Sequence, residues 1–415
     1  MESLQPIKER YLEISHIELY LDDNGRRSTT YLQWQTDLIG HMRYLSNFSL
    51  ASPLSVSKQI HPAYNLEANP DLEGIHFFDL PAVSGNRQTL LHIPSRIIKL
   101  FQAIKQNDII HVTTAAGLIP NAWLAVPLAR ILKKRLVVIV ESAFWRIPNW
   151  KHASAKSRIF SFISEAINRW CVNCADISIF TQEEYYRSLL TKRRNRGNVI
   201  PASWINESDI ISNDDAEKLW QKKLSETAHE FKILYAGSLT SDKGILVLLE
   251  AVKILESGSS RILLDIIGKG DLLSLCKEVA RNANGQIRMN VLDTIPYGSQ
   301  FFQLIREYHA VVVPSITDEQ PRIVYDAYCQ AVPSLASHTS GLHSCVSHGE
   351  TGMLVKPNDP HALAELLTWA SNNLNQLKTM GLAGIEKAKK MTFRQMHEKR
   401  WKLILQMLGG DFDIQ

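Results

Sequence analysis

The sequence predicts an α/β protein built from two Rossmann-like, doubly wound domains. The chain has 415 residues, which exceeds what one hydrophobic core usually organises and fits two domains of about 200 residues each. Short apolar runs alternate with longer amphipathic ones through both halves, as in parallel sheets flanked by helices. A polar stretch rich in Asp, Asn, Ser and Lys, residues 204–230, separates the two patterns. We therefore expect one domain over residues 1–205 and a second over residues 206–390.

Each half supplies four strand candidates with helices between them. In the first half we expect strands at 14–21, 108–113, 136–140 and 177–181, and helices at 31–45, 93–103 and 121–132. In the second half we expect strands at 232–236, 263–267, 310–313 and 334–336, and helices at 245–255, 272–282, 321–331 and 361–373. Ligands of open α/β sheets bind beyond the carboxyl ends of the strands, so the residues that follow each strand are the most informative.

The composition is that of an ordinary soluble protein and argues against several classes. The 46 basic and 42 acidic residues give a net charge of +4. So small an excess does not indicate a nucleic-acid-binding protein, which carries a clustered basic surface. The first ten residues are polar and mixed in charge, unlike a secretory signal, and no apolar run approaches the ~20 residues of a membrane span. Cys171 and Cys174 form a C-x-x-C pair without the second pair of a zinc site, so two small buried thiols are expected rather than a redox centre. We expect a cytoplasmic protein, with a contact to the inner face of a membrane left open.

A glycine-rich turn with a lysine follows the strand expected at 232–236. The segment runs from Gly237 to Lys243 and Gly244, and a helix is expected next. Glycine lets the backbone approach a ligand closely. The helix dipole disfavours a cation such as Lys243 at this end unless an anion is bound there. A solvated lysine beside Asp242 is an equally good interpretation of these residues alone.

The turn Gly268-Lys269-Gly270 follows the strand expected at 263–267. It is a G-x-G pattern without the third glycine, because Leu273 stands in that place. This is weak evidence for a dinucleotide site and argues against a nicotinamide-dependent dehydrogenase. A tight turn from strand to helix explains it at least as well.

Two carboxylates stand near the helix expected at 321–331. Pro321 suits the first position of that helix, with Asp318 or Glu319 near its cap. Asp318 and Asp326 can accept hydrogen bonds from sugar or ribose hydroxyls. The alternatives are plain helix capping for Asp318 and a solvated helix face for Asp326.

Taken in order, these segments resemble the retaining family-four glycosyltransferases, which belong to the glycosyl transferases group 1 and have the GT-B fold. The matching series is Gly237-x5-Lys243-Gly244, Gly268-x-Gly270, Pro314-Ser315, the acid pair with Pro321, and Gly349-Glu350-Thr351-Gly352-x-Leu354-Val355-x-Pro357. The resemblance covers residues 231–388, and the first half resembles the family only loosely. It implies an acceptor-side domain over 1–205, a donor-nucleotide domain over 206–390, and a return of residues 391–415 to the first domain.

The resemblance also implies an activity and a set of site residues. A sugar would move with retention from a nucleotide-diphosphate donor to a glycan, lipid-linked or small-molecule acceptor, without a metal or other cofactor. Lys243 would hold the diphosphate, Asp318 would contact the transferred sugar and Asp326 the ribose. The further donor-binding residues implied by the family pattern are Gly25, Gly237, Ser238, Gly268, Glu319, Arg322, Ile323, Val324 and Gly341.

Several positions depart from the family pattern. Ser238 replaces an arginine that would partner the lysine, with Arg322 as a candidate substitute, and both motif glutamates are aspartates. If the register slips by one residue, Glu319 becomes the first acid. A catalytically silent sugar-nucleotide-binding subunit of a glycan-assembly complex is therefore the main alternative.

Two other features carry alternatives of their own. Gly25 is the candidate for a loop facing the donor, or else part of a type I′ turn at Asn24-Gly25. The basic run 192–196 is expected to be a solvated helix end, with a contact to anionic lipid as the alternative. The run 133–135 is expected to cap a helix C-terminus.

Overall fold

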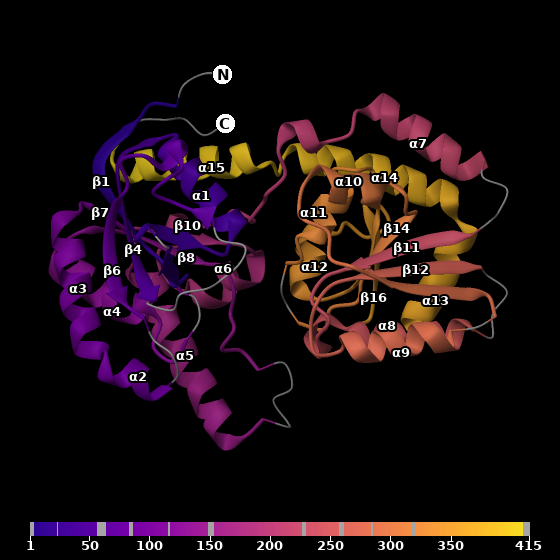
Figure 1. Ribbon diagram of the computed structural model, residues 1–415, viewed down its shortest axis with the longest axis horizontal. Coiled ribbons are helices and arrows are strands. Elements are labelled where there is room, and N and C mark those ends of the chain that lie inside the picture. Colours follow the sequence, from indigo (N-terminus) through magenta and orange to yellow (C-terminus); the bar gives the residue numbers. More distant parts are fainter. Residues whose placement is uncertain are drawn as a thin grey trace. The chain divides into compact units, whose positions relative to one another are not determined.

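The computed structural model describes residues 4–22, 24–55, 64–82, 86–114, 117–147, 153–225, 230–256, 261–283, 285–317 and 320–409, and it divides into two compact units (Figure 1). Unit 1 comprises residues 1–201 and 396–415, and unit 2 comprises residues 202–395. The last helix, α15 (Phe393–Met407), begins in unit 2 and belongs to unit 1 from Met396 onward. The boundaries expected from the sequence lie after residue 205, where the first domain was to end, and before residue 391, where the chain was to return to it.

Unit 1 is built on a ten-stranded sheet with the order β10-β9-β8-β7-β1-β4-β2-β3-β5, in which β6 also pairs with β4. The six strands from β10 to β4 run parallel, whereas β3 is antiparallel to both β2 and β5. The strands are β1 (Ile7–Ile14), β2 (Leu19–Leu21), β3 (Arg27–Thr29), β4 (Leu45–Ser55), β5 (Tyr64–Asn65), β6 (His76–Pro81), β7 (Ile109–Thr113), β8 (Arg135–Val140), β9 (Ile177–Phe180) and β10 (Gly197–Val199).

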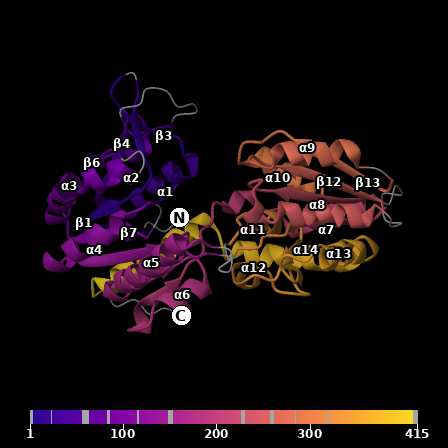
Figure 2. The same ribbon diagram turned by 90° about the horizontal axis from the view of Figure 1, so that it is seen from below.

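Strand alternation gives the two faces of this sheet different partners. Leu12 and Ile14 of β1 join the apolar cluster beneath α3 (Ile93–Gln106), α4 (Asn121–Ile131) and α5 (Ala155–Cys174). These three helices lie side by side, with α4 packed against both neighbours (Figure 2). Tyr11 and Glu13 point to the opposite face, towards α1 (Leu32–Met42) and α15. The remaining helical elements of unit 1 are α2 (Asn86–Leu91), α6 (Glu183–Leu189) and the short turns η1 (Pro70–Leu72) and η3 (Arg194–Arg196).

The expected first strand at 14–21 was wrong. The central strand is β1, and residues 19–21 form the separate short strand β2. Strand β1 was not predicted because it begins with the polar run Lys8-Glu9-Arg10, which breaks the apolar pattern. These side chains lie exposed or half-buried, while the end of the strand is fully buried. Strands β4 and β6 were not expected, since β4 is rich in serine and contains Pro53.

Unit 2 is built on a six-stranded, all-parallel sheet with the order β13-β12-β11-β14-β15-β16. Helices α8 and α13 share an apolar cluster on one face, and α10, α11 and α12 share another on the opposite face. The strands are β11 (Phe231–Ala236), β12 (Ile262–Ile267), β13 (Ile287–Leu292), β14 (Ala310–Val313), β15 (Ser334–Ser337) and β16 (Gly352–Val355). The helices are α7 (Asn213–Ser225), α8 (Ile245–Leu255), α9 (Leu273–Asn282), α10 (Ser299–Arg306), α11 (Ile323–Tyr328), α12 (Ser340–Cys345), α13 (Pro360–Asn372) and α14 (Leu374–Lys389), with the short turns η4 (Glu207–Asp209) and η5 (Ser241–Lys243).

Helix α11 is shorter than the expected span of 321–331. Pro321 precedes it, and Arg322 occupies the cap position. The chain reverses after α11 because Ala331 adopts a left-handed backbone with φ 59°, and Val332 N donates to the carbonyl of Ala327 at 2.9 Å. This is a helix-ending turn of the kind that glycine usually forms.

Two further sequence expectations concern thiols and membrane spans. Cys171 is a free buried thiol, and burial raises its pKa to about 12, whereas Cys174 is only partly buried. Within the described ranges, no helix is long and apolar enough to cross a bilayer.

Candidate functional site

In unit 2, the loops that follow β11, β12 and β14 pack against one another at the carboxyl edge of the sheet. Gly237 N donates to the carbonyl of Ile267 at 3.0 Å, and Leu239 N donates to that of Lys269 at 2.8 Å. On the other side, Ile316 N donates to the carbonyl of Asp242 at 3.0 Å. Three segments separated by up to 79 residues therefore form one continuous surface.

Glycines make this close packing possible. Gly244 has φ +73°, and a Cβ added there would lie 1.8 Å from the carbonyl oxygen of Pro314. A Cβ on Gly268 would lie 1.9 Å from the carbonyl oxygen of Gly237. Any larger residue at either position would force these loops apart, so both glycines are required for the shape of the edge.

Lys243 ends the turn η5, immediately before Gly244. Its side chain is 24% exposed, and its Nζ lies 3.6 Å from Oδ2 of Asp242. Its loop contacts the Pro314–Ile316 segment, which leads towards the acid motif. Ser238, in the same loop, is exposed, and its carbonyl accepts a hydrogen bond from the Tyr235 hydroxyl at 2.7 Å. Lys243 thus lies at the junction of the β11 and β14 loops.

Asp326 lies inside unit 2, so the alternative of a solvated helix face was wrong. Its side chain is buried, and the Tyr297 hydroxyl donates to Oδ1 at 2.8 Å. Burial raises the pKa of Asp326 to about 7, although the Tyr297 hydrogen bond and the nearby Arg322 oppose the rise. The Arg322 guanidinium in turn lies 5.6 Å from the ring centroid of Tyr297. Tyr297 is a member of this group that sequence reasoning missed, because it precedes α10 and belongs to no motif of the family.

Of the other predicted donor-site residues, some begin the helices α11 and α12 and some lie outside the described residues. Asp318 and Glu319 lie outside the described residues. Ile323 and Val324 begin α11 with buried side chains, and Val324 N donates to the carbonyl of Pro321 at 3.3 Å. Gly341 is buried in the first turn of α12.

Gly25 lies in unit 1, at the turn between β2 and β3. It has φ 73°, and its N–H donates to the carbonyl of Asp22 at 2.9 Å. The alternative of a type I′ turn with Asn24-Gly25 at its centre was wrong, because this hydrogen bond makes Gly25 the fourth residue of a turn that begins at Asp22.

Unit 1 contains a buried polar cluster that sequence reasoning missed. Its core members are Glu13 on β1, His111 on β7, Asp37 and His41 on α1, and His397 and Arg400 on α15. Arg400 Nη1 lies 3.0 Å and His397 Nε2 lies 3.2 Å from Oδ1 of Asp37. His41 Nδ1 lies 3.8 Å and His111 Nδ1 lies 4.0 Å from Oε2 of Glu13. The members are up to 387 residues apart in the chain, so no local spacing could have revealed them.

Burial decides the charge of most groups in this cluster. Burial raises the pKa of Glu13 to about 8 and lowers that of His111 to about 3. The pKa of His41 also lies well below its usual range, for the same reason. Burial alone would raise the pKa of Asp37, but Arg400 and the neighbouring histidines hold it well below its usual range. Asp37 therefore stays ionised beside Arg400, whereas burial favours the uncharged forms of Glu13, His41 and His111.

Two sets within the cluster have donor atoms close enough to hold a metal ion. They are Glu13 with His41 and His111, and Asp37 with His41 and His397, and the donor atoms of each set lie within 4.8 Å of one another. Four separate elements, β1, α1, β7 and α15, contribute the members of these two sets, so no local spacing in the sequence indicates them. Asp37 is already paired with Arg400, a cation that disfavours a second positive charge there. Activity without a metal stays a prediction.

The fold and the carboxyl edge of unit 2 define a class. The two parallel-sheet Rossmann-like units are those of the GT-B fold, and residues 216–387 match the family described as "Glycosyl transferases group 1". This match lies within unit 2 and includes Lys243, Gly268, Asp326 and Gly341.

Particular relatives support the same class. The D-inositol 3-phosphate glycosyltransferase of Corynebacterium glutamicum (strain R) is 28% identical over 183 residues, 43% of this chain and 44% of the relative. The capsular polysaccharide biosynthesis glycosyltransferase CapM of Staphylococcus aureus is 24% identical over 233 residues, 54% of this chain and 59% of the relative. The chain thus spans about half the length of these curated relatives. The crystal structure of Anabaena Alr3699/HepE in complex with UDP has a TM-score of 0.66 at 15% identity, covering 96% of this chain and 100% of that one.

Proposed function

We propose that this protein is a glycosyltransferase that moves a sugar from a nucleotide-diphosphate donor to a glycan, lipid-linked or small-molecule acceptor. The observation that carries the proposal is the family match over residues 216–387, combined with the junction of the β11 and β14 loops at Lys243. The relatives with named roles in polysaccharide biosynthesis and the fold neighbour that binds UDP support the same donor chemistry.

In the proposed reaction, unit 2 binds the donor and stabilises the leaving diphosphate. Negative charge accumulates on the diphosphate as the bond to the sugar breaks, and a positioned cation lowers the energy of that state. Lys243 is the proposed cation, and Arg322 is the candidate to replace the arginine absent at Ser238. The backbone N–H groups of Ile323 and Val324, at the start of α11, are proposed to face the donor phosphates, and the long 3.3 Å bond of Val324 N to the Pro321 carbonyl would be given up or shared when the donor binds.

The two motif acids are proposed to position the sugar and the ribose. Asp318 would orient the transferred sugar, and Asp326 would accept a hydrogen bond from the ribose. With Tyr297 donating to Oδ1 of Asp326, Oδ2 is the oxygen that we assign to the ribose contact. Gly25 of unit 1 is proposed to contact the donor from the acceptor-side domain.

We further propose that transfer retains the anomeric configuration and needs no metal. The direct experiment is a transfer assay with a panel of sugar nucleotides, first chosen by thermal shift, since a ligand at 100 times its Kd stabilises by about 2.7 kcal/mol. Product configuration by NMR tests retention. Activity that disappears in EDTA and returns with magnesium or manganese would contradict the metal-free mechanism.

A catalytically silent sugar-nucleotide-binding subunit is the second candidate. Ser238 in place of an arginine and the two aspartates in place of glutamates favour it, because each weakens a donor contact. Such a protein would show donor-induced thermal stabilisation with neither transfer nor donor hydrolysis. Release of the nucleoside diphosphate in the presence of an acceptor would exclude it.

A further inference from the structure

Helix α5 of unit 1 has its amphipathic character reversed. Four large apolar side chains point outward, with exposed fractions of 60% for Ile159, 74% for Phe162 and 47% each for Ile163 and Trp170. Its buried residues are mostly small or polar, namely Ser161, Ser164, Asn168, Cys171 and Val172. A surface helix normally buries its apolar stripe against the core. The outward stripe of α5 therefore calls for an apolar environment outside the folded unit.

The neighbouring helices of the same layer extend this apolar surface. In α3, Ile97, Ile98 and Phe101 are exposed, at 37%, 58% and 40%, and α2 exposes Leu90 and Leu91. Helix α4, packed between α3 and α5, ends at Ile131, which is 74% exposed. We call these side chains of α2, α3, α4 and α5 the outer helix face; Figure 2 shows these helices. Exposed large apolar side chains gathered on neighbouring helices point to an interaction site.

The charges around the outer helix face are almost all positive. Residues 80–174, which include α2, α3, α4 and α5, contain 13 Lys or Arg against three acids, Asp108, Glu141 and Glu165. Arg10 pairs with Asp108 at 2.8 Å, and Arg146 and Arg169 pair with Glu165 at 2.9 and 3.3 Å. The exposed charged residues of α3 and α5 include Lys99, Lys105, Lys156 and Arg169, whereas the whole chain carries only +4. Exposed apolar side chains with a large excess of cations around them suit an anionic bilayer.

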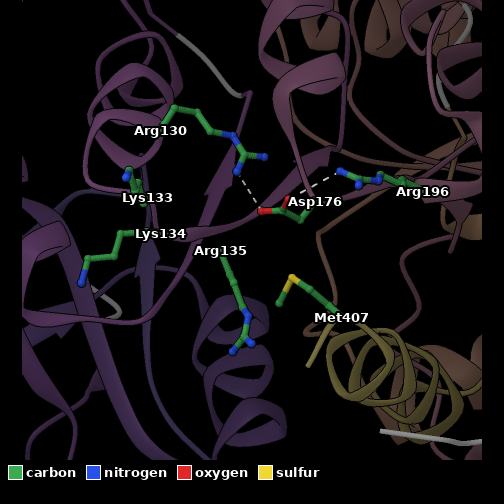
Figure 3. A pocket seen from close by; sticks show the side chains of 7 residues that line it. All are labelled: Arg130, Lys133, Lys134, Arg135, Asp176, Arg196 and Met407. Atoms are coloured by element: carbon green, nitrogen blue, oxygen red, sulfur yellow. Dashed lines mark hydrogen bonds and ion pairs between the residues drawn. The ribbon is translucent and has the colours of Figure 1, made fainter. Parts of the chain in front are cut away.

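A basic pocket adjoins this face where α4 ends (Figure 3). It has a volume of about 540 Å³ and is lined by Arg130, Lys133, Lys134, Arg135, Asp176, Arg196 and Met407. Asp176 forms ion pairs with two arginines: Arg130 Nη1 lies 3.0 Å from its Oδ2, and Arg196 Nη1 lies 3.5 Å from its Oδ1. Lys133 and Arg135 are exposed. Arg130 also donates to the carbonyl of Cys174, at the end of α5. The pocket brings Arg196, from the basic run 192–196, together with the run 133–135.

We propose that the outer helix face docks onto an anionic lipid bilayer, with its apolar side chains in the interfacial layer and the basic pocket against headgroup phosphates. This rests on the proposed function and deepens it, since a lipid-linked acceptor would then be met at the surface to which unit 1 is bound. A protein partner is less suited, because a charge of one sign around a broad apolar surface matches the uniform charge of an anionic leaflet.

The test is co-flotation with phosphatidylglycerol-containing vesicles and with phosphatidylcholine vesicles of equal size. We expect binding to the anionic vesicles that is at least tenfold stronger than to the neutral ones and that falls as salt rises. The triple variant Phe162→Ser, Ile163→Ser, Trp170→Ser should lose at least tenfold in binding. Its matched control is Leu246→Ser, an apolar residue 38% exposed on α8 of unit 2, which should bind as the unchanged protein does.

A charge variant separates the two parts of the surface. Lys133→Gln, Lys134→Gln, Arg135→Gln should weaken binding to anionic vesicles and flatten its dependence on salt, whereas Lys277→Gln on α9 should change neither. Failure of the unchanged protein to bind anionic vesicles would overturn the proposal, as would equal binding by the triple variant. A dimer in light scattering that the triple variant converts to monomer would also overturn it and assign the face to a second copy.

Activity readouts keep this proposal distinct from the proposed function. The triple variant should keep its circular dichroism spectrum, its thermal midpoint within a few degrees and its donor hydrolysis rate in solution. Lys243→Ala should lose transfer and still bind vesicles. Vesicle binding without any transfer activity would leave the docking surface standing and remove the proposed enzyme.

Discussion

The two units share a parallel-sheet architecture and differ in where they put polar and apolar side chains. Among the described residues, large apolar side chains with substantial exposure lie in unit 1, with Leu246 of unit 2 as the exception. Unit 1 also encloses the Asp37–Arg400 ion pair, with His397 beside Asp37, and buries His41 and His111 beside Glu13. Unit 2 follows the usual distribution, with apolar clusters on both faces of its sheet and exposed polar loops at the carboxyl edge.

This difference separates two tasks within one chain. The unit with the usual distribution contains the family match and the proposed donor site, where glycine-lined loops must hold one geometry. Unit 1, which has the unusual distribution, offers the outer helix face as a surface for the proposed bilayer. It also encloses the Asp37–Arg400 ion pair. Side chains that look misplaced for folding alone point to interactions that the isolated chain does not contain.

The largest effect is expected at the buried ion pair of unit 1. Arg400→Met leaves the largely buried Asp37 carboxylate with His397, at 3.2 Å, beside it. It should lower the free energy of unfolding by about 3–5 kcal/mol, because the permanent countercharge is lost. The double variant Asp37→Asn, Arg400→Met should recover most of that loss, because no isolated charge remains. Lys402→Met, an exposed neighbour on α15, is the control for urea unfolding. Equal losses in Arg400→Met and Lys402→Met would show that the ion pair is not buried in solution.

The next effect concerns catalysis in unit 2. Lys243→Ala should lower kcat/KM by about 100- to 1000-fold, or roughly 2.7–4 kcal/mol, because it removes the charge proposed to stabilise the leaving diphosphate. Lys253→Ala, an exposed lysine further along α8, should leave the kinetics unchanged. Steady-state measurements with the natural donor decide between them, and unaltered kinetics in Lys243→Ala would rule out its phosphate role.

Asp326 makes stability depend on pH. Its pKa of about 7 in the fold exceeds the ~3.9 of an unfolded aspartate, so the protonated form is favoured by folding. That contribution is fully present below about pH 4 and is lost as the pH rises towards 7. Asp326→Asn avoids the loss, so its free energy of unfolding should gain about 4 kcal/mol relative to the unchanged protein as the pH rises from below about 4 to above about 7.

Glu13 extends this test to unit 1. The pKa of Glu13 in the fold is about 8, so the stability that its protonated form contributes is lost up to about pH 8 rather than pH 7. The stabilisation by Glu13→Gln should therefore continue to grow above pH 7. Unfolding free energies across pH 4–9 measure both windows. The exposed Asp271→Asn on the β12–α9 turn should show no such trend, and a flat profile for either buried acid would contradict its burial.

The smallest effect is expected at the left-handed turn after α11. Ala331→Gly should raise the free energy of unfolding by about 0.5–1 kcal/mol, because glycine adopts φ 59° without the Cβ conflict. Ala280→Gly within α9 has an ordinary helical backbone and should lose about 1 kcal/mol. The same sign for both changes would mean that the strain at Ala331 is relieved in solution.

Periodicity and glycine placement predicted most of unit 2. Strands β11, β12 and β14 are buried apolar runs that end at turn residues, and each lies close to its expected position. Gly237, Gly268 and Pro314 are the residues that follow them. The edge strands β13 and β16 were not expected, since their polar or short sequences carry no periodic signal. In unit 1, β1 was misplaced because local polarity at Lys8–Arg10 outweighed the buried half of the strand.

The sequence by itself determined the alternation of strands and helices, the positions of the glycine turns, and the residues that stand at the carboxyl edge of unit 2. These are local properties, set by periods of two and 3.6 residues and by backbone freedom. The tertiary structure alone decided that Asp326 is buried against Tyr297, that Glu13 meets His41 and His111, and that the apolar side of α5 faces outward. The protonation of Glu13 and Asp326 follows from how neighbouring elements remove water from them, and water is removed by packing between segments remote in the chain.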